Sequence, residues 1–505
     1  MKRLIPFLLA LLFLLSSCDV SLPSAPDGCE SHTDTDSDGL CDICSFSVLL
    51  EFDIFSINDL HGKIADGDSH VGVDELTTYI KNARGKNSNL LLISAGDMWQ
   101  GSSESNLTKG FITTEWMNEL DFDAMAMGNH EYDWGEAPIE ENAGIAEFPI
   151  LAINIYDRQT NLPVEYCQSS ILVDRGGVQI GIIGAIGDVY SSIASERVED
   201  VYFVTGDSLT RLVKAESEYL RSMGADLIVY VLHDGHDRSS SSVKDVNANT
   251  IDDYYDTSLS DGYVDLVFEA HTHQHYVLRD EYGVYHLQNG GDNKNGISYV
   301  EVVFNTANGT HKITHAKLVS YTEYAFLPDD PVVEGLLEKY EDDIGFADEV
   351  LGKNSAERNR NFLRTTVAQL YYDAGVAKWG SEYDIVLGGG YLNVRSPGYL
   401  GAGDVTYSEL QGLFPFDNEL VLCSVKGRDL LDKFFNSSND SYFIAYGDYG
   451  ESVKNNIDLN ATYYIIVDTY TSTYAPNNLT EVERYGADVF ARDLLAEYVK
   501  QGGLE

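Results

Sequence analysis

Five short polar motifs, each directly after an apolar run that predicts a buried strand, contain side chains that bind divalent metal ions. The motifs are Asn58-Asp59-Leu60-His61, Gly96-Asp97, Gly128-Asn129-His130-Glu131, Leu232-His233-Asp234 and His271-Thr272-His273, and the runs before them are Leu49–Ile57, Leu90–Ser94, Phe122–Met127, Leu227–Leu232 and Val264–Phe268. Ligands of open α/β sheets bind beyond the carboxyl ends of the strands, so these side chains should meet at one edge. Carboxylate, amide and imidazole donors together suit a pair of zinc, manganese or iron-type ions. The predicted ligands are Asp59, His61, Asp97, Asn129, His233, His271 and His273.

Strand-like and helix-like patterns alternate along the chain, which predicts an α/β fold with a sheet covered by helices. The expected helices are Val73–Ala83, Leu209–Met223, an acidic connector at Val332–Tyr340, and Thr366–Trp379. A second domain should follow the connector, with strands at Asp384–Leu387 and Tyr463–Asp468 and a turn at Gly388-Gly389-Gly390.

The first residues have the pattern of a bacterial export signal. Lys2 and Arg3 precede the apolar run Leu4–Leu15, which is too short to span a bilayer as a mature helix. The sequence Leu15-Ser16-Ser17-Cys18 resembles a lipobox, which implies that Cys18 is lipidated; a plain secretory signal with an incidental cysteine is the alternative. We expect residues 1–18 to be the signal peptide of a lipoprotein in the cell envelope, outside the cytoplasm and in contact with the membrane through its lipid anchor only.

The charge of the chain restricts its partners. Over 505 residues the formal net charge is -48, which would repel the backbone of a nucleic-acid polymer. A phosphate ester is also an anion, so bound dications and local arginines must reverse the field inside any cleft that binds one.

A cysteine-rich and acidic tether is expected at 19–46. Cys29, His32, Cys41 and Cys44 have the spacing of a small zinc site, because three thiolates and one imidazole complete a tetrahedron. The alternating Asp34, Asp36 and Asp38, followed by Gly39, are typical instead of the start of a calcium loop. The twelfth loop position is Ser45 and not glutamate, so an EF-hand is not supported. Zinc, calcium, both ions, or a flexible spacer with a disulfide remain open.

The five metal-type motifs together resemble the calcineurin-like metallophosphoesterases, and most closely the bacterial 5'-nucleotidase and 2',3'-cyclic phosphodiesterase family. The resemblance implies a four-layer α/β/β/α metallophosphoesterase domain at 47–325, a linker helix at 326–350 and a second α/β substrate-binding domain at 351–505. It also implies that Asp59, His61 and His273 hold one ion, that Asn129, His233 and His271 hold the other, and that Asp97 bridges them. One departure is Ala270, where the family usually has a glycine.

The resemblance assigns catalytic roles beside the metal ligands. Two dications lower the pKa of a bound water, so that hydroxide is available near neutral pH. In the family, the histidine at the position of His130 contacts the substrate and not a metal. We expect His130 to stabilise the transition state and donate a proton, and Asp133 to orient its imidazole and raise its pKa.

The second domain of the family sandwiches a nucleobase between two aromatic rings and grips the phosphate with arginines. Leu387-Gly-Gly-Gly390-Tyr391-Leu-Asn393-Val-Arg395 and Phe414-Pro415-Phe416-Asp417-Asn418 resemble the corresponding segments, which implies Arg395 as a phosphate contact and Phe416 as one ring. Arg360 and Arg364 are candidates for a second phosphate grip. The family's last aromatic motif is replaced by Asp468-Thr-Tyr470-Thr-Ser-Thr-Tyr474, so Tyr470 or Tyr474 is the candidate for the other ring, and a buried core tyrosine is the alternative.

The sequence therefore predicts an extracytoplasmic hydrolase of small phosphate esters, with nucleoside 5'-phosphates or 2',3'-cyclic nucleotides as substrates. The same chemistry on a nucleotide sugar or another phosphodiester is one alternative. A surface binding protein without catalysis is the other.

Overall fold

A computed structural model of the chain describes residues 32–66, 71–236, 255–289, 296–395, 397–436, 442–446, 450–473, 478–486 and 489–505. The predicted signal peptide with Cys18, the candidate zinc ligand Cys29 and the candidate ring Tyr474 lie outside these residues. The described chain divides into a smaller unit, 32–50 with 304–310, and a larger unit, 51–303 with 311–505. Within the described ranges, no helix combines the length and the apolar character that crossing a bilayer requires.

The first half of the larger unit is built on two six-stranded sheets. The strand order of one sheet is β14-β13-β1-β2-β3-β4, with β1 Leu49–Ile57, β2 Leu91–Ser94, β3 Ala124–Ala126, β4 Ile150–Leu151, β13 Ile297–Asn305 and β14 Thr310–Val319. The order of the other is β11-β12-β10-β9-β7-β6, with β6 Ser170–Arg175, β7 Val178–Ile186, β9 Leu227–His233, β10 Leu266–Glu269, β11 Tyr276–Arg279 and β12 Tyr285–Gln288. The pairs β1–β2, β2–β3, β7–β9 and β9–β10 are parallel, so their carboxyl ends share an edge.

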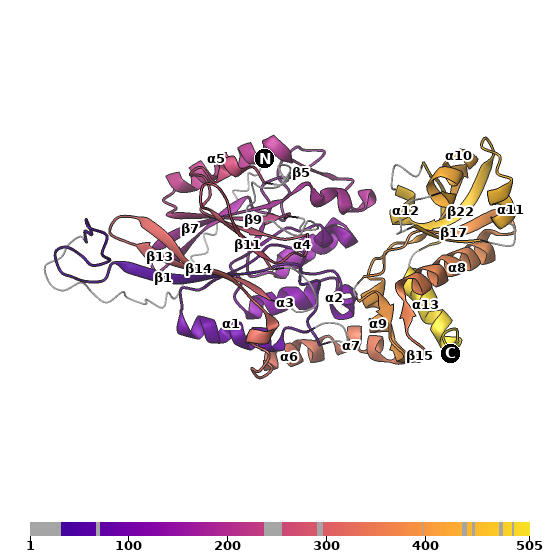
Figure 1. Cartoon of the computed structure of the whole chain (residues 1–505), viewed down its shortest axis with the longest axis horizontal. Coiled ribbons are helices and arrows are strands. Elements are labelled where there is room, and N and C mark those ends of the chain that lie inside the picture. Colours follow the sequence, from indigo (N-terminus) through magenta and orange to yellow (C-terminus); the bar gives the residue numbers. More distant parts are fainter. Residues whose placement is uncertain are drawn as a thin grey trace, which may run out of the picture. The chain divides into compact units, whose positions relative to one another are not determined.

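Helices cover the outer faces of the two sheets. Leu76 of α1 (Asp74–Lys86) and Trp116 of α3 (Phe111–Glu119) belong to the same buried cluster as Leu92 of β2. On the other side, Val213 of α5 (Gly206–Ser222) packs with Ile228 of β9. The sheets meet closely at Gly184, where an added Cβ would lie 2.3 Å from Leu151 Cβ. Figure 1 shows α5 on one side of the sheets and α1 on the other, which confirms the predicted α/β/β/α layers.

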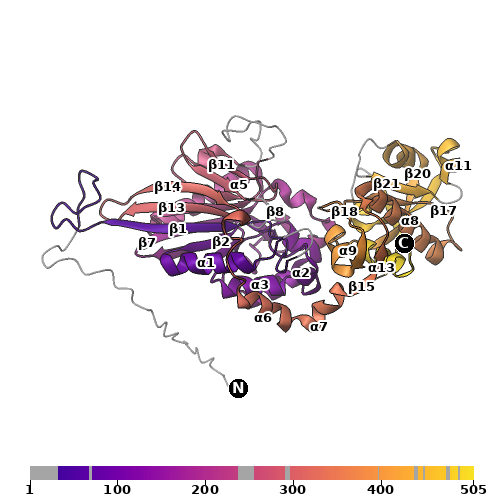
Figure 2. The ribbon, with the colours of Figure 1, turned by 60° about the horizontal axis from the view of Figure 1, so that its bottom comes forward.

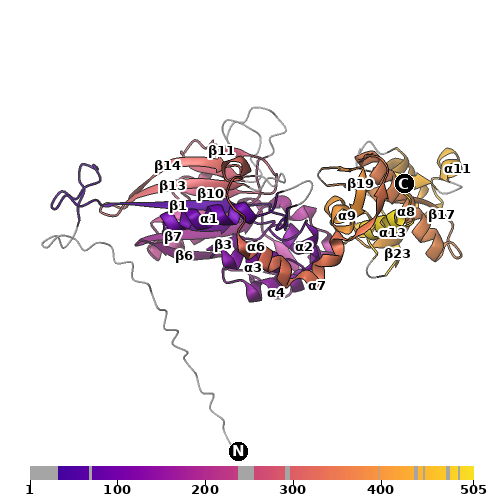
Figure 3. The same ribbon diagram turned by 90° about the horizontal axis from the view of Figure 1, so that it is seen from below.

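Two short helices, α6 (Pro331–Lys339) and α7 (Glu341–Ile344), lead from the sheets into the second half. Of the other short helices, α2 (Ser103–Leu107) packs on α7 and on α9 (Tyr407–Leu413), and α4 (Glu136–Ile145) packs on α3. Figure 3 shows α6 beside α3 and α7 beside α2. Asp330 caps α6 by accepting the N–H of Val332, and Pro331 occupies its first position, so the turn before the predicted connector starts a helix.

The second half has a five-stranded sheet in the order β21-β17-β22-β20-β23. Its strands are β17 Ile385–Tyr391, β20 Leu420–Lys426, β21 Tyr442–Tyr446, β22 Thr462–Asp468 and β23 Thr480–Arg484. Its main helices are α8 (Arg360–Trp379), α9 (Tyr407–Leu413), α12 (Thr469–Thr473) and α13 (Ala491–Lys500). Two-stranded sheets in this half join β15 Val350–Asn354 to β19 Gly403–Thr406 and β16 Arg358–Asn359 to β18 Tyr399–Leu400. A third two-stranded sheet, in the first half, joins β5 Ile155–Asp157 to β8 Val201–Phe203. Figure 2 shows α8 and α13 close together, and Leu363 and Leu495 pack in one core.

The glycine run that predicted a turn forms a strand instead. Gly388, Gly389 and Gly390 lie within β17 and pair with β21. A Cβ at Gly388 would lie 2.4 Å from the backbone nitrogen of Tyr372 in α8. The missing side chain therefore lets a helix lie directly on the strand, and the turn prediction was wrong because it considered only the flexibility of glycine.

Candidate metal centre and substrate cavity

The predicted ligands follow strands of both sheets and meet at their shared carboxyl edge. The loop after β1 is tied to the loop after β2, because Asp59 N–H donates to Gly96 O at 3.0 Å and His61 N–H donates to Asp97 O at 3.0 Å. The loop after β10 joins them, because His271 N–H donates to the Asp59 carboxylate at 3.1 Å. These hydrogen bonds hold the three loops together without a metal ion.

All seven predicted ligands come together in this place. Asp59, His61 and His273 form one group and Asp97, His233 and His271 another, with the donor atoms of each group within 4.8 Å of one another. Asn129 Oδ1 lies 2.8 Å from His271 Nδ1 and 3.1 Å from His233 Nε2, so the amide joins the second group. Asp97 also forms a group with His61 and His130, again with donor atoms within 4.8 Å of one another. The assignment of the ligands to two ions bridged by Asp97 stays a prediction.

The ligand loops have an unusual backbone. Asp59, His61, Asp97, His271 and His273 all have φ between 51° and 68°, in the left-handed region that residues other than glycine seldom adopt. Such conformations cost energy and cluster at functional sites. Gly128 has a packing role as well, because a Cβ there would lie 2.3 Å from Asp97 Oδ1.

Glu131 holds two of these loops together. Its buried carboxylate accepts the backbone N–H groups of Gly128 at 2.8 Å, Asp97 at 3.0 Å, Met98 at 2.8 Å and Trp99 at 3.3 Å. Glu131 is therefore a positioning residue for Asp97 and Asn129, although its own side chain is not a ligand.

The donor set fits divalent cations. His61 Nδ1 donates to Gln100 O at 2.8 Å, which leaves a lone pair on Nε2, 3.1 Å from His273 Nε2. His233 Nδ1 donates to Ala95 O at 2.7 Å, so its Nε2 faces Asn129 Oδ1 and, at 3.2 Å, Asp97 Oδ2. Lone pairs that face other lone pairs are favourable only with positive charge between them.

The pKa values of His271 and His273 agree with this fit, whereas His233 is favoured in its protonated form until a metal ion takes the place of the proton. Burial, with neighbouring positive groups, lowers the pKa of His271 to about 4 and of His273 to about 3, so both are neutral and able to coordinate. Burial also lowers the pKa of His233, but Asp97 outweighs it and raises that pKa to about 10. The centre thus stabilises positive charge beside Asp97.

His130 lies next to this centre and is oriented by a carboxylate. Its Nδ1 is 2.8 Å from Asp133 Oδ2, and its backbone N–H donates to Asp97 Oδ1 at 2.8 Å. Burial lowers the pKa of His130, but Asp133 and Asp97 outweigh that effect and raise it above the usual value. The imidazole is therefore favoured in its protonated, proton-donating form.

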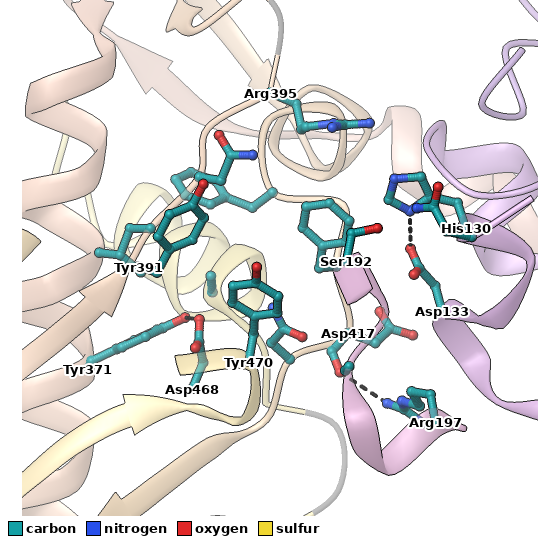
Figure 4. A pocket seen from close by; sticks show the side chains of 18 of the residues that line it. His130, Asp133, Ser192, Arg197, Tyr371, Tyr391, Arg395, Asp417, Asp468 and Tyr470 are labelled. Carbon is teal, nitrogen blue, oxygen red and sulfur yellow. Dashed lines mark hydrogen bonds and ion pairs between the residues drawn. The ribbon is translucent and has the colours of Figure 1, made fainter. Parts of the chain in front are cut away.

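A cavity of about 270 Å³ opens beside His130 and is lined by residues from both halves of the larger unit. Asn129, His130 and His271 from the first half and Tyr391, Arg395, Phe416 and Tyr470 from the second half are among the lining residues. Figure 4 shows His130 on one side of the cavity and Tyr391 and Tyr470 on the other. The ring of Phe416 stacks on His130 at 5.8 Å between centroids, and the Arg395 guanidinium lies 5.6 Å from the Phe416 centroid. Tyr391 and Tyr470 contact each other at 5.5 Å.

The charges around the cavity are distributed unevenly. Asp417 is paired with Lys109 at 2.7 Å and with Arg492, and Asp133 is paired with His130. In the part of the chain that the structure describes, Arg395 forms no ion pair with a carboxylate. Its cationic group is therefore available to an anionic ligand.

The remaining predicted substrate contacts lie elsewhere. Arg360 is exposed at the first residue of α8, and Arg364 is buried one turn further on; neither lines the cavity. The structure thus places Arg395, Phe416 and Tyr470 in the cavity beside the metal centre. It does not support Arg360 or Arg364 as a second phosphate contact.

Comparison with known proteins agrees with this arrangement. The profile of the calcineurin-like phosphoesterases matches residues 53–275, and that of the 5'-nucleotidase C-terminal domain matches residues 343–463. The chain belongs to the calcineurin-like phosphoesterases with a 5'-nucleotidase C-terminal domain. It is accordingly a metal-dependent hydrolase of phosphate esters.

Individual relatives are distant. Protein UshA of Yersinia enterocolitica is 26% identical over 433 residues, which cover 75% of this chain and 74% of UshA. Endonuclease YhcR of Bacillus subtilis is 25% identical over 407 residues; these cover 75% of this chain but only 32% of YhcR. The crystal structure of a 5'-nucleotidase precursor from Thermus thermophilus has the same fold, with a TM-score of 0.65, 18% identity, and coverage of 90% of this chain and 96% of that chain.

Several residues around the centre were not predicted from the sequence. Glu131, Tyr391 and Asp468 stand inside or beside the recognised motifs, so adjacency was a signal that could have found them. Ser192 and Arg197 of the first half also line the cavity, and their segment has no motif that predicts this position.

Proposed function

We propose that this phosphoesterase hydrolyses nucleoside 5'-phosphates, 2',3'-cyclic nucleotides, or both, outside the cytoplasm. The observation that carries the proposal is the single cavity that connects Asn129, His130 and His271 to Arg395 and to the rings of Phe416, Tyr391 and Tyr470. A phosphate and an attached planar base have chemically suitable partners within one space.

The residues of the chain divide the reaction between them. The seven ligands would hold two divalent ions, which would supply an activated water and offset charge on the phosphoryl group. The protonated His130 donates a hydrogen bond to the phosphoryl group and its proton to the leaving oxygen, as the bond between phosphorus and that oxygen breaks. Asp133 keeps Nδ1 of His130 engaged at 2.8 Å, so that Nε2 is the proton donor.

The second half supplies recognition. Among the described residues Arg395 has no ion-pair partner, and Asp133 and Asp417 are paired with other groups, so its guanidinium can bind the phosphate. An aromatic ring that stacks on a base contributes about 1–3 kcal/mol, and Phe416 and Tyr470 are half-buried rings on the cavity wall. This combination favours a nucleotide over a phosphate ester without a ring.

A phosphodiester substrate is the second candidate. Ser192 and Arg197 also line the cavity, and Arg197 donates to Asp417 O at 3.3 Å, so the wall offers polar groups to a second substituent on the phosphate. The distant relative YhcR is described as an endonuclease. Diesters and nucleotide sugars therefore belong among the tested substrates.

The test is a substrate panel with the manganese- or zinc-loaded protein: AMP, 2',3'-cyclic AMP, a UDP-sugar and bis-nitrophenyl phosphate. Release of phosphate from AMP supports the monoesterase proposal, whereas turnover of the UDP-sugar alone supports the second candidate. His130→Ala, with its metal content measured, is the matched control for contaminating phosphatases. If the metal-loaded protein turns over none of these compounds, the proposed substrates are wrong.

The proposed location has its own test. The Lys2-Arg3 start, the apolar run Leu4–Leu15 and Cys18 support export and lipid anchoring. In a bacterial host, Cys18→Ala should move the activity from the membrane fraction to a soluble fraction. Equal distribution of both proteins between these fractions would contradict the anchor.

A further inference from the structure

The smaller unit contains soft metal donors that the catalytic centre does not use. We propose that it binds one zinc ion through His32, Cys41 and Cys44. One donor atom from each of these side chains lies within 4.8 Å of the others. Nitrogen and sulfur together are the donor set of structural zinc sites.

The distance between two of the donors agrees with tetrahedral zinc. Cys44 Sγ lies 3.5 Å from His32 Nδ1. Zinc ligands at about 2.3 Å (sulfur) and about 2.0–2.1 Å (nitrogen), separated by a tetrahedral angle, are about 3.6 Å apart. Cys41 and Cys44 are both free thiols in the structure, so the pair is not arranged as a disulfide.

The backbone holds Cys41 in a tight turn beside the other two donors. The carbonyl oxygen of this buried residue accepts the N–H of Ser45 at 2.8 Å, which closes the turn that contains Cys44. The turn therefore keeps the two sulfur atoms on the same side of the segment, within 4.8 Å of the His32 donor nitrogen.

The segment also needs a cross-link. Residues 32–48 contain no helix and no named strand, and Leu40 and Ile43 are 44% and 67% exposed, so the core is small. Turn hydrogen bonds, such as Cys41 N–H to Phe46 O at 2.8 Å and Asp42 N–H to Thr33 O at 2.7 Å, already bring the donors together. The ring of Phe46 stacks on His32 at 5.7 Å. Small units of this kind are usually held by a metal or by disulfides.

The acidic residues have a different use. Asp34 accepts the N–H groups of Asp38 at 3.1 Å and Gly39 at 3.0 Å, and the Asn305 amide at 2.6 Å. These bonds fix the turn to residues 304–310 within the same unit. Asp34 thus stabilises the turn. Asp34, Asp36 and Asp42 also form a group whose carboxylate oxygens lie within 4.8 Å of one another, so the calcium alternative of the sequence stays a prediction. Cys29, the sequence candidate for the fourth zinc position, lies outside the described residues.

Cobalt substitution of the full chain tests the proposal, because only a site with thiolate ligands gives near-ultraviolet charge transfer from sulfur to cobalt. The catalytic ligands are oxygen and nitrogen atoms, so cobalt in that centre gives no sulfur-to-cobalt absorption band. We expect the band in the wild type and in His233→Ala, which removes a catalytic ligand. We expect it, with full zinc content, in Cys167→Ser, the matched cysteine control.

Cys44→Ser should lose one zinc ion per chain by elemental analysis, with unchanged phosphoesterase activity. Cys44→His retains a zinc ligand and should keep that ion, which separates a ligand role from a folding defect. A wild type without the band, equal zinc content in Cys44→Ser, or a Cys41–Cys44 disulfide in non-reducing peptide maps would each overturn the site. None of these results depends on which phosphate ester the enzyme hydrolyses.

Discussion

Replacing Glu131 with glutamine should loosen the metal centre without removing any ligand. The glutamine keeps one oxygen, which can still accept from Met98 and Trp99, but its NH₂ group then faces the N–H groups of Gly128 and Asp97. Two hydrogen bonds to a charged acceptor are lost, each contributing about 1.5–3 kcal/mol. We therefore expect these loops to be destabilised by about 3–6 kcal/mol in total.

The assay should measure the loops directly. Amide hydrogen exchange of peptides that contain residues 97–99 and 128 reports their opening, and dialysis against a metal buffer reports ion affinity. Loss of a partner that orients metal ligands typically lowers affinity by about 10–100-fold. Burial, together with Asp97, raises the pKa of Glu131 to about 7, so measurements at about pH 8 compare an ionised carboxylate with the amide.

The matched control is Glu140→Gln, which makes the same substitution at an exposed position of α4. It should change exchange and affinity little, because exposed substitutions are usually within about 0.5 kcal/mol of neutral. If Glu131→Gln exchanges and binds metal like the wild type, the carboxylate does not hold the loops, and the positioning role is wrong.

Three further changes separate the parts of the site. His130→Ala should keep its metal content and lower kcat about 10²–10⁴-fold, the usual contribution of a general acid; a matching loss of metal would show a structural role instead. Phe416→Ala should raise KM for AMP about 10–100-fold and leave hydrolysis of a small ring-free phosphate ester unchanged, which kinetics on both substrates would check. Chelation should abolish hydrolysis by the wild type, and manganese or zinc should restore it; activity that survives exhaustive chelation would refute a metal-dependent step at Asp97.

The metal ligands were predictable from the sequence because each follows a predicted strand. Asp59 and Asp97 follow neighbouring parallel strands of one sheet, so the strand pattern alone places them at one carboxyl edge. His233 follows a strand of the other sheet, so its approach to Asp97 also requires the two sheets to pack face to face. The strand pattern does not predict that packing, which the family resemblance implied.

The substrate side was less predictable because it depends on how distant segments pack. Arg360 and Arg364 have suitable chemistry, but helix α8 directs neither to the cavity. Tyr391 reaches it because β17 continues through Gly388–Gly390, which the sequence suggested as a turn. Glu131 was overlooked for a similar reason, since its partners include residues more than thirty positions earlier in the chain.

The chain's net charge of -48 is compatible with an anionic substrate because the carboxylates that line the cavity are either paired with positive groups or favoured in the neutral form. Asp417 is held by Lys109 and Arg492, and Asp133 by His130, so neither of these two carboxylates repels phosphate at full strength. Burial raises the pKa of Asp468, the third carboxylate on the cavity wall, which favours its neutral form. Arg395 keeps its charge available, and Asp97 concentrates positive charge at the metal centre. Field strength at a buried site is set by the few groups within several ångströms, since salt and water screen the distant surface. A cation-binding cleft in an acidic protein therefore selects small phosphate esters, which can enter it, over polyanions, which must also approach the acidic surface.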